Sequence, residues 1–277
     1  MAKPKIRERT LKRAHVNQKG GVGKTTWTLN VGAAAANLGA RVLIRDMDPQ
    51  GNATAALCPE PGEYSMTDVL TPDQETGEVV EGGLAGAIRR TGDQWPKTLY
   101  VVTADISLSN IETDNRTTGT PRERRLQVAS EGACDGFDLV LTDCPPSVGL
   151  LTLNALTDSD EVEIVTVPEQ WAVSGCHQAH RTIRLVQKYH NTNLEFGGVW
   201  INRYLMAGRH PRRESKAREE ELRNAPHFKG RVNDPVVTEI EAIRNAAGVN
   251  LPLYAYGPEA EEAARIFRMI AERALND

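Results

Sequence analysis

Hydrophobic and polar positions follow two alternating patterns along most of the chain. Short apolar runs typical of buried strands occupy residues 11–17, 41–45, 99–104, 137–142, 162–167 and 196–201. Stretches with helical periodicity or helix start signals lie between or after them, at residues 24–38, 121–134, 172–190, 212–224 and 258–275. This alternation predicts an α/β fold: a single doubly wound, mostly parallel sheet with helices on both faces.

Two segments depart from the alternation. Residues 58–97 are rich in Gly, Pro, Glu and Asp, with weak periodicity, and predict irregular surface structure with short helices. Residues 1–13 carry six basic side chains and one acidic one. They predict a basic N-terminal tail that is either solvated or an arm contacting an anionic partner. The folded domain is therefore expected over residues 14–277.

Composition excludes several classes of protein. The 277 residues are 40% hydrophobic and 25% charged, unlike a disordered, coiled-coil or collagen-like chain. A net charge of −4 excludes a uniformly basic coat for nucleic acid, although not a local patch. The four cysteines are far apart and form no zinc or disulfide pattern, which indicates a cytoplasmic location. No apolar run is long enough to predict a membrane span.

A glycine-rich turn stands between the first strand and the first helix. Its glycines let the backbone approach phosphate groups, while amide groups and the helix N-terminus face the anion. Lys24 is expected to bridge the β- and γ-phosphates, Thr25 to bind Mg²⁺, and Thr26 to reach the α-phosphate. The predicted phosphate-binding positions are Lys19, Gly20, Gly21, Val22, Gly23, Lys24, Thr25 and Thr26.

This turn departs from the common phosphate-loop pattern in one informative way. Gln18 stands where that pattern has glycine, and a second lysine, Lys19, follows it. A second cation there is suited to stabilise charge on the transferring phosphoryl group, as an arginine finger does. Its place early in the loop favours reaching across a dimer rather than into its own site.

At this point the chain resembles a known family. Three segments are similar to the nucleotide motifs of the ParA/Soj partition ATPases, of the deviant Walker A class of P-loop NTPases: NQKGGVGKTT (17–26), DMDPQGNAT (46–54) and DCPPSVGLLTLNAL (143–156). The resemblance continues through residues 167–175 and 181–188. It weakens at residues 1–10, 58–98 and 205–250.

The resemblance implies roles for residues outside the loop. Asp48 matches the residue that positions or activates the attacking water, and Asp46 matches one that supports Mg²⁺ through water. Asp143 ends an apolar strand and fits the Walker B role of holding Mg²⁺ through water. Adenine contacts are expected at Asn202 and Pro235, although the asparagine that accompanies this proline in the family is absent. The catalytic set is thus Lys19, Lys24 and Asp48, and the metal set is Thr25, Asp46 and Asp143.

Basic residues gather in the C-terminal half. Residues 203–231 hold nine basic and four acidic side chains. ParA-like ATPases bind DNA without sequence preference through this half, which implies contacts from Arg181, Arg184, Lys188, Arg203, Arg209, Arg212, Arg213 and Lys216. The alternative is a solvated helix with Glu–Arg pairs such as Arg218 and Glu221. Glu239 and Glu241 also stand where the family has arginines.

The resemblance implies a weak ATPase that uses ATP and Mg²⁺ and forms a homodimer on ATP binding. The dimer is expected to associate with nucleoid DNA, to be stimulated by a ParB-type partner, and to drive plasmid or chromosome partition. Three alternatives stay open: a MinD-like membrane-recruited regulator, a cofactor-assembly ATPase, and a DNA-binding regulator without catalysis. The first is disfavoured because acidic residues flank the apolar stripe of the last helix. The last is disfavoured by the intact Lys24, Thr25, Asp48 and Asp143.

Overall fold

The computed structural model describes residues 10–276 except residues 59, 61 and 117. These residues form a seven-stranded sheet in the order β3-β4-β2-β5-β1-β6-β7. The strands are β1 (Leu11–Val16), β2 (Val42–Asp46), β3 (Arg89–Arg90), β4 (Leu99–Val102), β5 (Leu139–Asp143), β6 (Glu161–Thr166) and β7 (Glu195–Ile201). All neighbouring strands pair in parallel except β3 with β4. The predicted fold class is confirmed.

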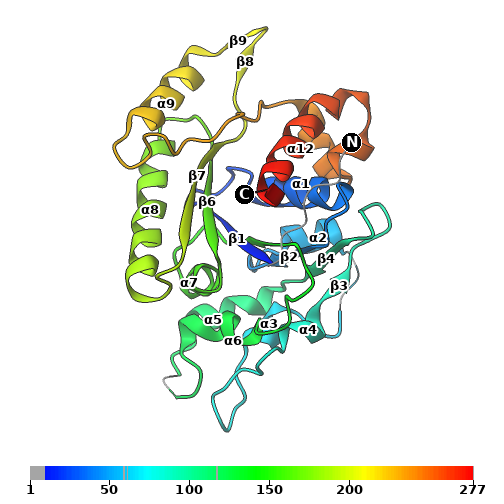
Figure 1. Cartoon of the computed structure of the whole chain (residues 1–277), viewed down its shortest axis with the longest axis vertical. Coiled ribbons are helices and arrows are strands. Elements are labelled where there is room, and N and C mark those ends of the chain that lie inside the picture. Colours follow the sequence, from blue (N-terminus) through cyan, green and yellow to red (C-terminus); the bar gives the residue numbers. More distant parts are fainter. Residues whose placement is uncertain (1–9, 59, 61, 117, 277) are drawn as a thin grey trace.

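Helices cover both faces of this sheet (Figure 1). One layer comprises α1 (Lys24–Asn37), α2 (Asn52–Leu57), α10 (Glu241–Gly248), α11 (Leu253–Tyr256) and α12 (Glu261–Asn276). The other comprises α3 (Met66–Leu70), α4 (Leu84–Ala87), α5 (Ser109–Thr113), α6 (Arg125–Ala129), α7 (Leu150–Thr157) and α8 (Ala172–Tyr189), with α9 (Arg213–Asn224) packed against α8. The short 3-10 turns are η1 (Ile106–Leu108), η2 (Arg122–Arg124) and η3 (Pro258–Ala260).

The apolar strand runs are explained by burial on both faces. Val42 and Ile44 of β2 pack in the core shared with α1 and α12, whereas Leu43 between them packs in the core on the opposite face. Successive side chains of a strand point to opposite faces, so a sheet covered on both sides needs an unbroken apolar run. Trp27 of α1 closes the first core, with its ring centroid 5.3 Å from those of Trp200 and Phe267.

Several elements differ from the sequence prediction. The helix expected at 121–134 is a 3-10 turn followed by α6, which ends at Ala129, because Gly132 adopts a positive φ of 67°. Strand β1 begins at Leu11, so residues 11–13 belong to the sheet rather than to the tail. Residues 1–9 of that tail lie outside the described residues. Helices α2, α5, α7, α10 and α11 were not predicted, and they are short, with four to eight residues each.

Beyond β7 the chain forms an edge that flanks the carboxyl end of the sheet. Residues 232–238 run beside β7, with parallel bridges between Val199 and Val232 and between Tyr204 and Thr238. A hairpin of β8 (Met206–Ala207) and β9 (His210–Pro211) projects from this edge (Figure 1). The hairpin carries basic residues away from the body of the molecule.

Candidate nucleotide site

The candidate site forms where β1, β2 and β5 end. These three strands are parallel neighbours, and Asp143 is in register with both His15 of β1 and Asp46 of β2. Parallel neighbours end at one edge of the sheet, so Asp46, Asp143 and the loop after β1 come together there. The structure thus unites residues that are more than a hundred positions apart in sequence.

The phosphate loop is shaped by two glycines with left-handed backbones. Gly21 has φ 75° and Gly23 has φ 82°. A Cβ on Gly23 would lie 2.5 Å from the amide nitrogen of Asn202, which donates a 3.0 Å hydrogen bond to the carbonyl of Val22. A Cβ on Gly21 would meet no atom within 4 Å. The loop is therefore packed against Asn202 at Gly23 and open at Gly21, as a phosphate cradle requires.

Lys24 begins α1 and folds back over this loop. Its Nζ donates a 3.2 Å hydrogen bond to the carbonyl of Asn17, and the side chain is buried. Asn17 is held in turn by a 2.7 Å bond from its Nδ2 to the carbonyl of Val165. Burial lowers the pKa of the Lys24 ammonium, against the opposite effect of the Asp143 carboxylate. Thr26 lies beside it in the first turn of α1.

Carboxylates and a hydroxyl converge beside Lys24. Thr25 donates a 2.7 Å hydrogen bond from Oγ1 to Oδ2 of Asp143. Burial, and then the nearby charge of Asp46, raise the pKa of Asp143 to about 7. Burial raises the pKa of Asp46 to about 6, although Thr54 donates to its carboxylate through both its backbone N–H and its hydroxyl, each at 2.8 Å. The Lys24 ammonium therefore does not by itself offset the burial of these carboxylates.

This oxygen set fits Mg²⁺. Among the described residues, no group of three or more His, Cys, Asp or Glu side chains is placed to hold a metal by itself. Magnesium takes few direct carboxylates and completes its shell with water and substrate phosphates. Thr25 is suited to bind the ion directly, and Asp143 and Asp46 to hold its waters. A divalent cation would also supply the missing charge.

Asp48 lies two residues beyond the end of β2, next to Asp46. Its backbone N–H donates to Oδ1 of Asp46 at 3.1 Å, and its own Oδ1 accepts from the N–H of Gln50 at 3.0 Å. The residue is 8% exposed. The second carboxylate oxygen has no hydrogen-bond donor among the described residues, so it is available to a water molecule.

Lys19 occupies the rim rather than the interior. Its ammonium forms an ion pair with Glu169, which follows β6, and the two side chains are 31% and 52% exposed. Glu169 was not predicted, because nothing in the local sequence links it to a loop 150 positions earlier. Within one protomer, Lys19 therefore has an acidic partner outside the phosphate cradle.

Two residues that were expected to contact adenine and DNA form hydrogen bonds to the phosphate loop. Asn202, the expected adenine contact, is 4% exposed and bonds to Val22. Arg203, an expected DNA contact, donates to the carbonyl of Gly21 at 2.9 Å and pairs with Glu239 at 3.3 Å. The structure thus places both side chains against the phosphate loop. Pro235, the other expected adenine contact, is half-buried in the segment beside β7.

A buried histidine close to Asp143 was also missed. His15 is fully buried in β1, with Nδ1 2.8 Å from Thr28 Oγ1, and this oxygen lies 3.4 Å from Asp143 Oδ1. On its other side, His15 Nε2 lies 3.4 Å from Glu163 of β6. A histidine inside an apolar strand, just before the glycine-rich turn, is the sequence feature that could have drawn attention to this position.

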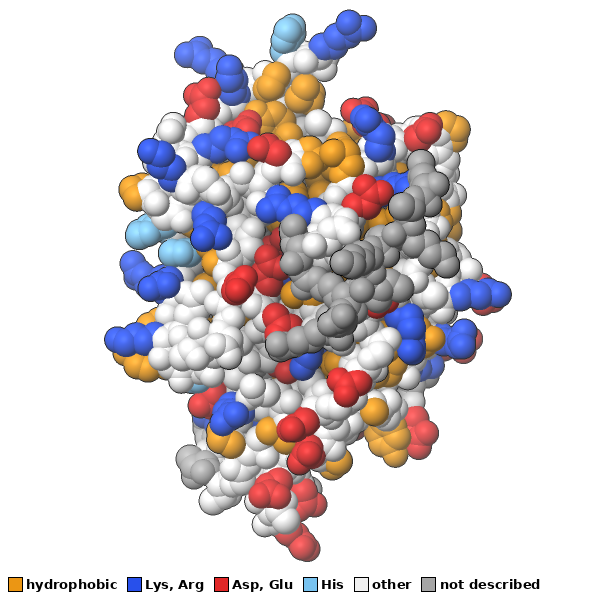
Figure 2. All heavy atoms as spheres, viewed as in Figure 1, with side chains coloured by type: hydrophobic (Ala, Val, Ile, Leu, Met, Phe, Trp, Pro, Cys, Tyr) orange, Lys and Arg blue, Asp and Glu red, His pale blue; other side chains and the backbone are white. Residues whose placement is uncertain are grey.

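The expected DNA contacts fall into two exposed groups. Arg181, Arg184 and Lys188 follow one another on α8, and Arg209, Arg212 and Arg213 lie on or next to the hairpin. Figure 2 shows basic side chains at the hairpin end and along the α8 edge, and acidic ones at the opposite end. On α9, Lys216 lies 3.9 Å from Glu220, and Arg218 and Arg223 also pair with glutamates. That helix matches the alternative of internal ion pairs.

Comparison with known proteins identifies the family. The family profile described as "AAA domain" matches residues 12–196. The sporulation initiation inhibitor protein Soj of Bacillus subtilis is 35% identical over 95% of this chain and 98% of its own length. The chain belongs to the ParA/Soj family of P-loop ATPases. The chromosome partitioning protein ParA of Caulobacter vibrioides (strain NA1000 / CB15N) is also 35% identical. The match covers 88% of this chain and 86% of the length of that protein.

A solved structure with bound nucleotide agrees with this ParA/Soj assignment. Cobyrinic acid a,c-diamide synthase from Mycobacterium smegmatis, with ADP and magnesium bound, superposes with a TM-score of 0.75. It is 30% identical and covers 96% of this chain and 94% of its own. The cofactors of this ParA/Soj ATPase are ATP and Mg²⁺. None of the helices in its described part has the length and apolarity to cross a bilayer.

Proposed function

We propose that this chain is a partition ATPase that dimerises on ATP binding, associates with DNA without sequence preference, and hydrolyses ATP slowly until a ParB-type partner stimulates it. One observation carries the proposal: Lys19 lies on the rim of the phosphate loop, directed to Glu169 and not to its own cradle. Lys24 already fills the interior position. A second ammonium on the rim is suited to the γ-phosphate of a facing protomer.

Lys19 can exchange Glu169 for another anionic partner. Both side chains are substantially exposed, and exposed ion pairs contribute about 0–1 kcal/mol to stability. A γ-phosphate offered by a second protomer therefore displaces Glu169 at little cost. In the closed dimer, water is excluded and the same charge interaction becomes stronger.

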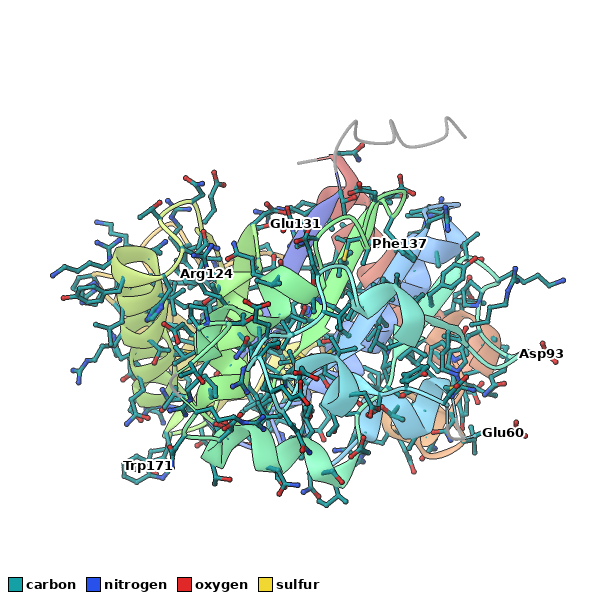
Figure 3. All side chains as sticks on the ribbon, turned by 90° about the horizontal axis from the view of Figure 1, so that it is seen from below. Glu60, Asp93, Arg124, Glu131, Phe137 and Trp171 are labelled. Atoms are coloured by element: carbon teal, nitrogen blue, oxygen red, sulfur yellow. The ribbon has the colours of Figure 1, made fainter. Side chains whose placement is uncertain are left out.

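Exposed apolar side chains near the loop fit a dimer face. Val148, in the loop after β5, is 45% exposed and lines a small cavity together with Asn17 and Gln18. Trp171, at the start of α8 and two residues after Glu169, is 67% exposed and points away from the molecule in Figure 3. Burying these two side chains against a second protomer would stabilise an association that places Lys19 at the partner's nucleotide.

The chemistry follows from the placement of the polar groups. Bound Mg²⁺ supplies positive charge to the phosphates. Lys24 and the loop amides hold the phosphates in place, and Thr25 and Asp143 fix the metal position. Asp48 has an oxygen available to orient the attacking water and to accept its proton. Lys19 of the second protomer stabilises charge that develops on the transferring group, which makes hydrolysis depend on dimerisation.

Light scattering and phosphate release test this mechanism. With ATP and Mg²⁺, Lys19→Ala is expected to stay monomeric and inactive, whereas Asp48→Ala is expected to dimerise without turnover. Lys229→Ala, an exposed lysine near α9, is the matched control and is expected to behave like the parent. If Lys19→Ala and Asp48→Ala both dimerise and hydrolyse ATP like the parent, the mechanism is wrong.

DNA association is the second part of the proposal. The exposed arginines of the hairpin and of α8 offer phosphate contacts without base readout. Affinity for random duplex should require ATP and should fall steeply with salt, because each phosphate contact releases counterions. Equal affinity with and without ATP would contradict the proposed cycle, in which the dimer occupies the nucleoid.

A cofactor-assembly enzyme is the second candidate function, because a cobyrinic acid a,c-diamide synthase is 30% identical over nearly the whole chain. The two candidates differ in what stimulates turnover. ATP hydrolysis that rises with duplex DNA and a ParB-type protein supports partition, and hydrolysis that rises only with a corrin carboxylate supports the synthase.

A further inference from the structure

A cavity of about 780 Å³ lies between α8, Phe196 of β7 and the loop that follows α9, and no residue assigned above to the nucleotide site lines it. One wall is the helix itself, with His177, His180, Arg181 and Arg184 spaced along one face. The other wall is the loop that follows α9, with His227 and Arg231. Three imidazoles and three guanidinium groups therefore meet in one hollow, from segments about fifty residues apart.

The histidine rings are held in place by aromatic packing. The rings of His180 and His227 stack with centroids 5.2 Å apart, and His177 lies 5.8 Å from His227. Phe228 lies 5.0 Å from His177, and Phe196 lies 5.2 Å from His180. The three imidazoles are thus part of a packed wall and keep a fixed relation to one another.

Positive charge in this hollow has no acidic counterpart. Among the described residues, the lining contains no carboxylate, and none of its arginines forms an ion pair. Arg184 donates to Oε1 of Gln187 at 3.0 Å, and Arg231 donates to the carbonyl of Phe196 at 3.2 Å. Burial lowers the pKa of His180, and so do the charges of His227, Arg184 and His177.

A bound anion would relieve this repulsion. Guanidinium groups bind phosphate oxygens with paired, charge-assisted hydrogen bonds, and a protonated imidazole adds a further donor. An anion favours the charged form of the neighbouring histidines. Binding and histidine protonation therefore strengthen each other.

We propose that this hollow is a binding site for a phosphate group and that His180 takes up a proton when the phosphate binds. The phosphate is that of a small free anion or of a DNA backbone. The second source rests on the DNA association proposed above, since Arg181 and Arg184 belong to both surfaces, whereas the first does not. Affinity should increase as the pH falls through the range in which histidine titrates.

Histidine NMR tests the site on the full chain with ADP and Mg²⁺ in the nucleotide site. The chain has only six histidines, so single His→Asn variants assign every imidazole signal. The probe is inorganic sulfate, a phosphate analogue whose charge is constant across this range. We expect saturable shifts of the His177, His180 and His227 signals, with tighter binding at about pH 6 than at about pH 8.

Two variants with equal charge change separate the pocket from general electrostatics. Arg184→Gln should weaken sulfate binding about tenfold or more, the effect of one lost charge-assisted hydrogen bond. Lys97→Gln, at an exposed lysine that does not line the hollow, should leave it unchanged. Equal effects of the two variants would overturn the proposal.

The choice of ligand separates the two sources. For the DNA measurement, ATP and Mg²⁺ replace ADP, because the proposed DNA association requires ATP. If random duplex DNA then shifts the three signals and sulfate does not, the site takes backbone phosphates. If neither ligand shifts them, the site does not exist. If sulfate binds while ATP-dependent DNA association is absent, the DNA part of the proposed function fails and the phosphate site stands.

Discussion

Asp143→Asn is expected to make the ligand-free protein more stable while it removes the response to Mg²⁺ and ATP. Asp143 is 1% exposed, and burial raises the pKa of its carboxyl to about 7. The neighbouring Asp46 carboxyl adds to this effect. Without a cation, the fold therefore bears the cost of a buried negative charge. The amide of asparagine has the same shape and can still accept the hydrogen bond from Thr25.

The sign and size follow from proton linkage. A carboxyl whose pKa rises from 3.8 unfolded to about 7 folded favours the folded state fully only below pH 3.8. That contribution is lost as the pH rises toward 7. At about 1.4 kcal/mol per pKa unit, the loss amounts to at most about 4 kcal/mol. Above pH 7 and without ligand, Asp143→Asn should therefore exceed the parent by about 2–4 kcal/mol, with little difference near pH 4.

Urea unfolding at both pH values measures this difference, and Glu75→Gln, an exposed carboxylate in a surface turn, is the control. In the parent, saturating ATP and Mg²⁺ should add about 3 kcal/mol of stability at a hundredfold excess over the dissociation constant. The variant should lose most of this gain. A ligand-free variant no more stable than the parent at pH 8 would refute the reasoning.

Three further substitutions test the packing and the loop. Asp158→Asn leaves the fully buried Arg45 without its carboxylate and should cost about 3–5 kcal/mol in urea unfolding. Gly23→Ala forces a side chain onto the amide of Asn202 at a positive φ, so ATP affinity measured by calorimetry should fall by tenfold or more while the fold is retained. Trp27→Ala empties the core below α1 and should cost about 3–5 kcal/mol, seen as a lower Tm in a thermal scan; an unchanged Tm would contradict the packing described.

Structural features that depend on one short stretch of sequence could be predicted without the structure. The run FDLVLT at 137–142 predicted a strand because a sheet covered on both faces requires consecutive apolar side chains. The glycines and lysines of residues 19–24 predicted a phosphate loop because that local geometry needs those residue types. In contrast, α5 and α11 carry too few turns for their periodicity to stand out.

Pairings between distant residues were decided only by the tertiary structure. Arg45 lies in a strand that reads as mostly apolar, and its counter-charge, Asp158, is 113 positions away. Two other contacts also join residues far apart in sequence. They are the ion pair of Lys19 with Glu169 and the packing of His227 against the histidines of α8. Each depends on which strands become neighbours and in what register.

The amino-acid sequence alone determined the α/β class, the place of the phosphate loop and the residue types suited to ATP and Mg²⁺. Backbone conformation and burial pattern are local properties, so short stretches of sequence encode them. The tertiary structure decided the partners of the charged side chains and turned Asn202 and Arg203 toward the loop. Electrostatic energy depends on the distance between the charges in space and on the exclusion of water. Both are fixed only when the sheet is assembled.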